Sequence, residues 1–208
     1  MELLMEPNLP IISRIHKAAF ELFAEKGEKQ VSISELAQTA GIARGTVYNH
    51  VPSPEALFET VAARMAEEMH ERVVASFAGV PDPAHRLANG IRYFIRRAHD
   101  EPHWGRFLSR FAFSHKALQG MWAGAAMRDV LDGLEQQRYD FHPGQRHSAM
   151  ALIAGAVLAS ILLVLDGHRT WRDAGSDTAE LVLRALGVGV EAARRYATDE
   201  LPPLADCA

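Results

Sequence analysis

Apolar residues recur at three- and four-residue intervals along most of the chain, and almost no segment alternates with the two-residue period of a strand. Stretches that contain proline and glycine interrupt this pattern and divide it into helices. We therefore expect an all-α fold. The predicted helices span residues 9–26, 33–40, 43–51, 54–77, 83–99, 103–113, 116–138, 149–165 and 177–196.

Residues 32–50 predict two short helices joined by a glycine turn. Ser32 stands three residues before Glu35, which is the spacing of a capping box, so the first helix is expected to begin at residue 33. Gly41 is expected to end it, because glycine adopts the left-handed backbone conformation without steric cost. A short turn that contains glycine is typical of a helix-turn-helix unit.

The second of these helices has an apolar side and a polar side. Ile42, Val47 and Val51 are expected to face inward. The outward side chains are hydrogen-bonding types that suit phosphates and base edges, and they are Arg44, Thr46, Asn49 and His50. An ordinary helical hairpin with a merely solvated polar side has the same spacing, so a DNA-binding function needs further support.

A family resemblance supplies that support, since residues 11–58 resemble the N-terminal DNA-binding domain of the TetR family of transcriptional regulators. The matching positions in the first helix are Ile15, Ala18, Ala19, Leu22, Phe23 and Gly27. The match continues through ISELAQTAGIARGTVYNHV and SPEALFETV. The resemblance implies a three-helix DNA-binding domain in which residues 44–50 form the recognition helix, the helix that enters the major groove.

The candidate DNA-binding residues that this resemblance implies are Arg44, Gly45, Thr46, Tyr48, Asn49 and His50. Arg44, Thr46 and Asn49 would lie toward base edges and nearby phosphates. Tyr48 and His50 would anchor the sugar-phosphate backbone. Gly45 lacks a side chain, so it would let the positively polarised N-terminus of the helix approach the DNA closely.

The chain departs from the common pattern of the family at three positions. Ala43 stands where the family commonly has a polar N-cap, which forfeits roughly 1 kcal/mol of helix stability. Val51 replaces an aromatic residue, and Pro54 replaces a lysine that would contact phosphate. These differences bear on the affinity for DNA and not on the fold.

Charge gives no independent support for DNA binding. Through residue 52 the chain carries five Lys and Arg residues against six acidic residues, and the formal net charge of all 208 residues is −4. A protein that coats nucleic acid nonspecifically is normally basic. The acidity therefore favours a selective operator binder that relies on a few aimed groups, with affinity that falls modestly as salt rises.

The cysteine content and the N-terminal residues point to a cytoplasmic protein. The single cysteine, Cys207, has no partner within the chain, so we expect no disulfide. The first ten residues carry acids and prolines, so we expect no secretory signal. Residues 149–165 form an uncharged stretch of 17 residues, the short limit for a membrane span. Its five alanines favour a helix buried within a protein assembly instead.

The breaks in the pattern suggest four parts: a helix-turn-helix domain at 1–52, a connecting helix at 53–80, an effector-binding and dimerisation domain at 81–200, and a tail at 201–208. The last two long helices are candidates for a homodimer interface, which is the mode of the resembled family, although they could instead only close the core of one protomer. The small residues of these helices would allow close approach, and the larger aliphatic residues would fill the spaces between them. The residues are Ala151, Ala154, Gly155, Leu158, Ala159, Leu162, Ala185, Leu186, Gly189, Val190, Ala192 and Ala193.

The middle of the chain combines bulky apolar residues with arginine and histidine, and the family resemblance implies a small-molecule cavity there. The candidate ligand-binding residues are Arg96, His99, Trp104, Phe107, Phe111, Met121 and Trp122. Each bulky residue can equally be core. Arg92 and Arg96 share a helix face, where they hold an anion or form a solvated edge. Pro102 separates His99 from His103, and no third ligand is evident, so we expect neither a metal site nor a cofactor.

The sequence as a whole favours a regulator over an enzyme. We expect a homodimer that binds a near-palindromic operator, because a dimer places two recognition helices about 34–36 Å apart on one side of DNA. A small-molecule effector would release it. Two alternatives stay open: a helical ligand- or partner-binding protein with weak or no DNA binding, and a helical enzyme that uses the central cavity.

Overall fold

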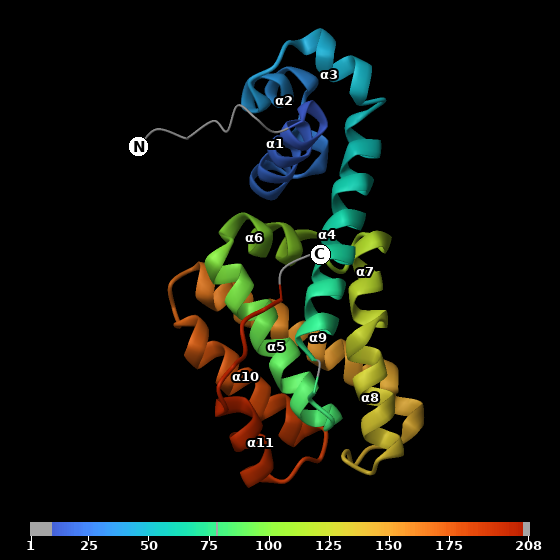
Figure 1. Cartoon of the computed structure of the whole chain (residues 1–208), viewed down its shortest axis with the longest axis vertical. Helices are drawn as coiled ribbons and strands as arrows, with labels where there is room; N and C mark the ends of the chain where they lie inside the picture. The colour runs from blue at the N-terminus through green and yellow to red at the C-terminus, as the bar shows by residue number, and fades with distance from the viewer. Residues whose placement is uncertain (1–9, 78, 206–208) are drawn as a thin grey trace. The chain divides into compact units, whose positions relative to one another are not determined.

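The computed structural model describes residues 10–77 and 79–205, which contain α-helices, two short 3-10 helices and no strand (Figure 1). The chain divides into two compact units, one up to residue 64 and one from residue 65. The N-terminal unit holds α1 (Ile11–Lys26), η1 (Glu28–Gln30), α2 (Ile33–Ala40), α3 (Arg44–His50) and the first half of α4 (Pro54–Ser76). The all-α prediction is confirmed.

The core of the N-terminal unit is small and is made by one side of each helix. Its completely buried large side chains are Ile15, Phe23, Leu36, Val47 and Phe58, which come from α1, α2, α3 and α4. The rings of Phe23 and Phe58 meet edge to face with 5.1 Å between their centroids. Because α3 gives only Val47 to this core, the packing fixes the helix through its inner side and leaves the rest of its surface free.

The predicted start and end of α2 are confirmed. The Glu35 amide donates to the Ser32 hydroxyl over 3.3 Å, and the Ser32 amide donates to a Glu35 carboxylate oxygen over 3.0 Å, which completes the capping box. Gly41 follows the helix in the left-handed conformation, with φ 63° and ψ 39°. The Ile42 amide then donates to the Ala37 carbonyl over 3.0 Å, so the turn satisfies carbonyls that the helix end leaves open.

The C-terminal unit is built around α5 (Pro83–Asp100), which packs against five other helices. These are α6 (Pro102–Phe111), α8 (Ala125–Glu135), α9 (Arg146–Leu165), α10 (Trp171–Ala185) and α11 (Val190–Thr198), and α7 (Lys116–Ala123) joins α8. A 3-10 turn, η2 (Pro143–Gln145), precedes α9. The completely buried side chains of the C-terminal unit include Tyr93, Trp104 and Phe107.

Two long helices predicted from the sequence are each broken in the structure. The predicted helix over 116–138 divides at Gly124, where φ is −88° and ψ is −117°. The predicted helix over 177–196 begins earlier, at Trp171, because Thr170 caps it by accepting from the Asp173 amide. It then stops before Gly187, which has φ +94° and lies so close to Asp140 that any Cβ there would be 2.7 Å from the Asp140 backbone nitrogen.

Gly175 lies within α10, because the helix begins before the predicted start at residue 177. It is buried, and a Cβ added to it would lie 3.6 Å from the Cγ atom of Arg92. This is an ordinary packing distance, so α10 and α5 lie in contact here without needing a glycine. The contact forms one wall of a polar hollow that Arg92 also lines.

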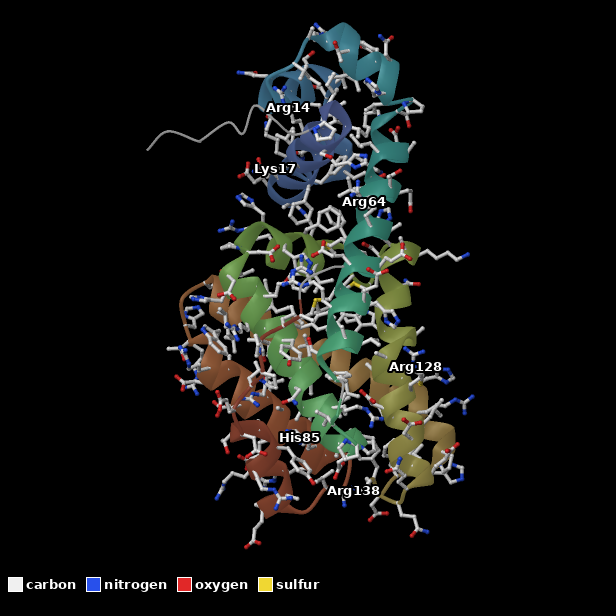
Figure 2. All side chains as sticks on the ribbon, viewed as in Figure 1. Arg14, Lys17, Arg64, His85, Arg128 and Arg138 are labelled. Atoms are coloured by element: carbon white, nitrogen blue, oxygen red, sulfur yellow. The ribbon has the colours of Figure 1, made fainter. Side chains whose placement is uncertain are left out.

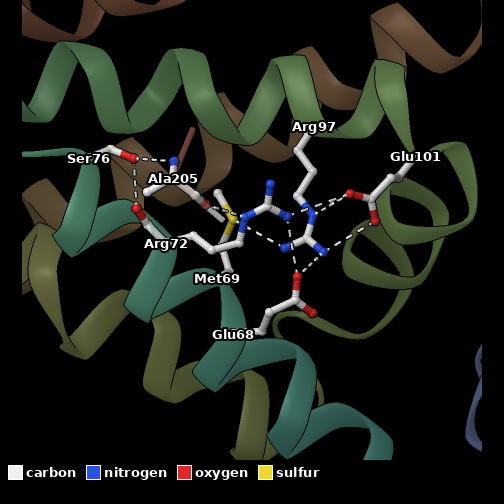
Figure 3. Close-up of polar contacts among 7 residues, drawn as sticks. All are labelled: Glu68, Met69, Arg72, Ser76, Arg97, Glu101 and Ala205. Carbon is white, nitrogen blue, oxygen red and sulfur yellow. Dashed lines mark hydrogen bonds and ion pairs between the residues drawn. The ribbon is translucent and has the colours of Figure 1, made fainter. Parts of the chain in front are cut away.

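A network of charged side chains joins α4, α5 and the end of the chain within the C-terminal unit (Figure 3). The Arg97 guanidinium is 6% exposed; it donates to Glu68 over 2.7 Å and to Glu101 over 3.1 Å. Arg72 donates to the Ala205 carbonyl over 2.9 Å, and Ala205 donates its amide to Ser76 over 2.8 Å. The last described residues are thereby held against α4.

Helix α9 contains the long apolar stretch noted in the sequence. Together with the preceding 3-10 turn, it is the one helix of the described chain that is long and apolar enough to span a membrane. Half of its most apolar window is buried, and it packs against α5, α6, α8 and α10. The remaining half includes the exposed side chains of Leu152, Leu162 and Leu163.

Candidate nucleic-acid interface and ligand cavity

Helix α3 carries all six candidate DNA-binding residues. Arg44, Gly45, Tyr48, Asn49 and His50 are exposed, and Thr46 is half-buried. Tyr48 is 60% exposed, which is unusual for an aromatic side chain that could have joined the core. Buried Val47 therefore fixes the helix, while hydrogen-bonding side chains and one aromatic ring are exposed on its surface.

The N-terminus of α3 is open in two respects. Ala43 occupies the N-cap with φ −68° and ψ 143° and supplies no side-chain acceptor. A Cβ added at Gly45 would meet no atom within 4 Å, so this side of the first turn borders open space. An uncapped helix N-terminus with free space before it suits an anionic group, since the backbone N–H groups and the helix dipole both favour negative charge.

Arg14 positions the turn before the candidate DNA-binding helix, and it was not among the residues predicted from the sequence. From α1 its guanidinium donates to the Ala40 carbonyl over 3.1 and 2.7 Å and to the Gly41 carbonyl over 2.7 Å (Figure 2). A positive charge at the C-terminus of α2 also complements the helix dipole. Arg14 thus fixes the turn from which α3 departs, but its partners lie 26 and 27 residues away, so no local pattern reveals it.

A second link ties α1 to α4 within the N-terminal unit. The Arg64 Nη1 atom lies 2.7 Å from the Nδ1 atom of His16 (Figure 2). Burial lowers the pKa of His16, and the positive charge of Arg64 lowers it further. The imidazole is therefore held neutral, and its nitrogen can accept the hydrogen bond from Arg64.

The C-terminal unit encloses an apolar cavity of about 50 Å³. Its walls come from α4, α5, α7, α8 and α9 together with Phe77. The residues that line it are Ala66, Met69, His70, Val73, Phe77, Arg86, Leu87, Gly90, Ile91, Phe94, Met121, Trp122, Ala125, Ala126, Asp129, Ile153 and Val157. This volume is the space open to the centre of a water-sized sphere. One water needs about 10–15 Å³ of it, so the cavity has room for about four waters.

One end of the cavity is charged. Asp129 is 4% exposed and accepts from the Arg86 Nε atom over 2.6 Å, while Arg86 donates to Asp132 over 2.7 Å. Burial raises the pKa of Asp129 to about 6, because the cost of removing the carboxylate from water exceeds the stabilisation that Arg86 supplies. A ligand in the cavity would therefore meet an aromatic and aliphatic wall with a buried polar pair at one side.

The candidate ligand-binding residues are not all gathered at this cavity. Met121 and Trp122 line it. Trp104, Phe107 and Phe111 are buried core residues of α6 that do not reach it. The reason is the rotation of the helices: the apolar side of α6 packs against α5 and α9, whereas the cavity is closed by α4, which the sequence analysis treated only as a connection.

The two polar candidates, Arg96 and His99, also lie elsewhere. His99 is exposed, and Arg96 borders a separate hollow beside α10. Within residues 10–77 and 79–205, no three histidine, cysteine, aspartate or glutamate side chains converge as metal ligands would. Cys207 lies outside the described residues.

The residues considered for a homodimer interface are divided between surface and core. Ala151, Ala159, Leu162, Ala185 and Val190 are exposed. Ala154, Leu158, Leu186 and Ala193 are buried within the protomer, Gly155 and Ala192 are half-buried, and Gly189 lies in the break before α11. The exposed side of α9 and α10 therefore has a different composition from the predicted one, with Leu152, Leu163 and Leu181 added to it.

Comparison with known protein families decides the assignment. Residues 82–198 match the model of the tetracyclin repressor-like C-terminal domain, and residues 15–61 match that of the tetR family of bacterial regulatory proteins. The chain belongs to the TetR family of transcriptional regulators. The second match contains the whole helix-turn-helix pair, and the first contains most of the helices that enclose the cavity.

Individual TetR-family relatives show how far the similarity extends. An uncharacterized HTH-type transcriptional regulator of Mycobacterium tuberculosis is 32% identical over 89 residues, which are 43% of this chain and 44% of that protein. The match therefore spans less than half the length of this curated relative. Crystal structures of RolR in complex with resorcinol and of a TetR-family regulator from Shewanella sp. PV-4 resemble nearly the whole chain.

The RolR structure has a TM-score of 0.73 and 29% sequence identity, and the match covers 94% of this chain and 96% of RolR. The Shewanella structure has a TM-score of 0.75 at 20% identity and covers 87% of this chain and 100% of that chain, which supports the fold alone. RolR is therefore a relative in sequence as well as in architecture. Its structure contains resorcinol, a single-ring aromatic diol.

Proposed function

We propose that this TetR-family chain is a ligand-responsive transcriptional repressor of the cytoplasm. It binds a near-palindromic DNA operator as a homodimer and is released by a small-molecule effector. The observation that carries the DNA-binding part is the surface of α3, where Val47 is fully buried while Tyr48 is 60% exposed beside exposed Arg44, Asn49 and His50. Helices anchored in this way read base edges and phosphates.

Operator affinity of the α3 variants Tyr48→Ala and Asn49→Ala tests this assignment. We expect Asn49→Ala to lose about tenfold or more for the best operator and to relax its base preference, because an amide that reads adenine contributes about 1–3 kcal/mol. Tyr48→Ala should weaken all sequences more evenly. Lys29→Ala is the matched control, since it removes a cation of the same unit outside α3.

The homodimer in this proposal forms through α9 and α10. These helices leave Leu152, Leu162, Leu163 and Leu181 exposed, with Leu181 at 61%. A surface of that apolar character is expected to be covered in solution. Sedimentation of Leu162→Glu and Leu181→Glu variants tests the interface: both should be monomeric and should bind a half-site far more weakly than the dimer binds the full operator.

The effector in this proposal is a small single-ring aromatic compound that enters the cavity. The cavity offers aromatic walls from Phe94 and Trp122 and a polar end at Arg86 and Asp129, which suits a ring with a hydroxyl group. RolR, which resembles this chain at 29% identity, binds resorcinol. The effector must bind one arrangement of the protein more tightly than the other, because equal affinity would shift nothing.

Resorcinol and other simple phenols are the compounds to test first. Binding should raise the apparent melting temperature and release DNA in the same concentration range. Ala126→Leu fills space at the cavity wall, so this variant should keep operator binding and lose the response. Stabilisation by a phenol without any effect on DNA would contradict release by this effector.

A second candidate function is a helical ligand- or partner-binding protein with little DNA affinity. Ala43, which leaves α3 without a side-chain cap, and Pro54, which replaces a phosphate-contacting lysine, favour it. A gel shift with the promoter of its own gene and of the adjacent gene separates the two functions. Retarded bands that disappear with Asn49→Ala support the repressor.

A further inference from the structure

A second hollow lies in the C-terminal unit, apart from the apolar cavity. It has a volume of about 380 Å³, and its walls come from α5, the first turns of α10, the end of α11 and the segment that follows. We name it the arginine hollow. Its lining residues are Arg92, Arg96, Trp171, Arg172, Gly175, Ser176, Thr198, Asp199, Glu200 and Leu201, none of which lines the apolar cavity.

Arg92 is the innermost cation of the arginine hollow, and its hydrogen bonds go to uncharged acceptors. It is 7% exposed, and its guanidinium donates to the carbonyls of Asp199 over 2.7 Å and Tyr196 over 3.4 Å and to the Asn89 side chain over 3.4 Å. Among the described residues no carboxylate oxygen lies within ion-pair distance of it. Burial lowers the pKa of the Arg92 guanidinium and outweighs the attraction of the nearby Asp199 carboxylate, so a further anion at its edge would be stabilising.

The other two arginines hold their guanidinium groups against the ring of Trp171. The Cζ atom of Arg172 lies 4.4 Å and that of Arg96 lies 5.2 Å from the centroid of this ring. A guanidinium over an aromatic ring is attracted by that ring, and its N–H groups can still bind an oxyanion. Arg172 has no hydrogen-bond acceptor in the described part of the chain, and Arg96 has only Asp100, 3.5 Å away at the exposed rim.

The charge of the lining limits what the hollow would accept. Its three arginines face two acidic residues, Asp199 and Glu200, which leaves one positive charge. The Asp199 carboxylate lies 3.8 Å from the Nε2 atom of His85 and beyond ion-pair distance of Arg92, although its charge still acts on that guanidinium. A singly charged carboxylate matches this balance and the planar fork of a guanidinium, whereas a doubly charged phosphate would be repelled by the two acids.

The wall that carries Asp199 is fixed at both ends. Arg92 holds the Asp199 carbonyl, and Arg72 and Ser76 of α4 hold Ala205 six residues later (Figure 3). The opposite wall is helical, since Gly175 and Ser176 belong to α10. The hollow is therefore formed before any ligand arrives, which lowers the entropic cost of binding.

From this arrangement we infer that the arginine hollow is a second ligand site, which binds a small organic monocarboxylate between Arg92, Arg96 and Arg172. The carboxylate lies at the guanidinium edges, and the organic body fills the remaining volume toward Leu201. This site is independent of the effector cavity. It does not require the cavity to bind a phenol.

Isothermal titration of the full-length protein with benzoate tests the inference, with benzamide as the uncharged analogue of the same shape. We expect benzoate to bind at least about tenfold more tightly than benzamide, since hydrogen bonds from a guanidinium to a charged carboxylate are stronger than those to a neutral amide. Arg172→Ala should weaken benzoate by about tenfold. Arg184→Ala, which removes another exposed arginine of α10 outside the hollow, should leave the affinity unchanged.

Two further measurements separate this site from its alternatives. Ala126→Leu, which fills the apolar cavity, should retain benzoate binding; loss of binding in this variant would place benzoate in the cavity and overturn the inference. Equal affinities for benzoate and benzamide would also overturn it. Inorganic phosphate should not compete with benzoate, and effective competition would contradict the assignment to a monocarboxylate.

Discussion

The two units of the chain use polar side chains in opposite ways. In the N-terminal unit they serve the backbone at the surface: Ser32 and Glu35 cap the start of α2, and Arg14 caps its end. In the C-terminal unit charged groups such as Arg92 and Asp129 are buried beside a hollow or a cavity. Capping produces a rigid exposed surface, whereas buried charge produces a site that discriminates among ligands.

The difference follows from what each unit has to contact. DNA is larger than the protein surface that reads it, so its recognition needs side chains that project from a preformed helix. A small molecule is recognised by enclosure, which removes water and strengthens each polar contact. The same physical difference should appear in how each unit responds to pH and to loss of one polar side chain.

The largest expected effect concerns Asp129 in the C-terminal unit. Its pKa is raised from 3.8 to about 6, so the folded state binds this proton more tightly than the unfolded state does. The stability that protonated Asp129 contributes is present below pH 4 and is lost as pH rises through 6. Relative to Asp129→Asn, the native protein should therefore lose roughly 2–3 kcal/mol of unfolding free energy between pH 4 and pH 7.

Chemical unfolding followed by tryptophan fluorescence measures this loss selectively, because Trp104, Trp122 and Trp171 all belong to the C-terminal unit. Asp132→Asn is the matched control: Asp132 shares Arg86 with Asp129, but its side chain is 46% exposed. The control should show little of this pH dependence. If the unfolding free energies of the native protein and Asp129→Asn change with pH in the same way, burial does not raise the pKa of Asp129.

A smaller effect is expected for Arg14→Ala in the N-terminal unit. This variant removes the donors to Ala40 and Gly41, and the carbonyls it leaves are partly accessible to water. We expect a loss of about 2 kcal/mol in the stability of α2 and α3, because hydrogen bonds from a charged group contribute about 1.5–3 kcal/mol. Operator affinity should fall with it, since α3 is no longer held at one angle.

Hydrogen exchange of the α2 and α3 amides measures this effect, since tryptophan fluorescence does not report on the N-terminal unit. Lys17→Ala is the matched control on α1, because it removes an exposed cation that caps nothing (Figure 2). Equal protection in the two variants would mean that the Gly41 turn holds α3 without Arg14.

How much of each unit could be predicted from the sequence depends on how far apart the interacting residues are. The capping box and the Gly41 turn were predictable because their partners lie within five residues. The backbone carbonyls that accept from Arg14 and Arg92 lie 26 to 107 residues away, so these contacts leave no local pattern. The breaks at Gly124 and Gly187 were missed because apolar spacing continues across them, and the lining of the cavity was missed because it depends on the rotation of α4.

The smallest expected effect tests whether the N-terminal unit gives up stability for an open helix end. Ala43 has the extended backbone of an N-cap without a side-chain acceptor, so Ala43→Ser should stabilise α3 by about 1 kcal/mol. Ala43→Val keeps the position uncapped and should give no such gain. Hydrogen exchange of the α3 amides compares the two variants, and equal protection would mean that the cap position does not limit the helix. If the open end is instead the place where a DNA phosphate binds, Ala43→Ser should gain stability without a proportional gain in operator affinity, because the added hydroxyl competes with the phosphate for the same N–H groups.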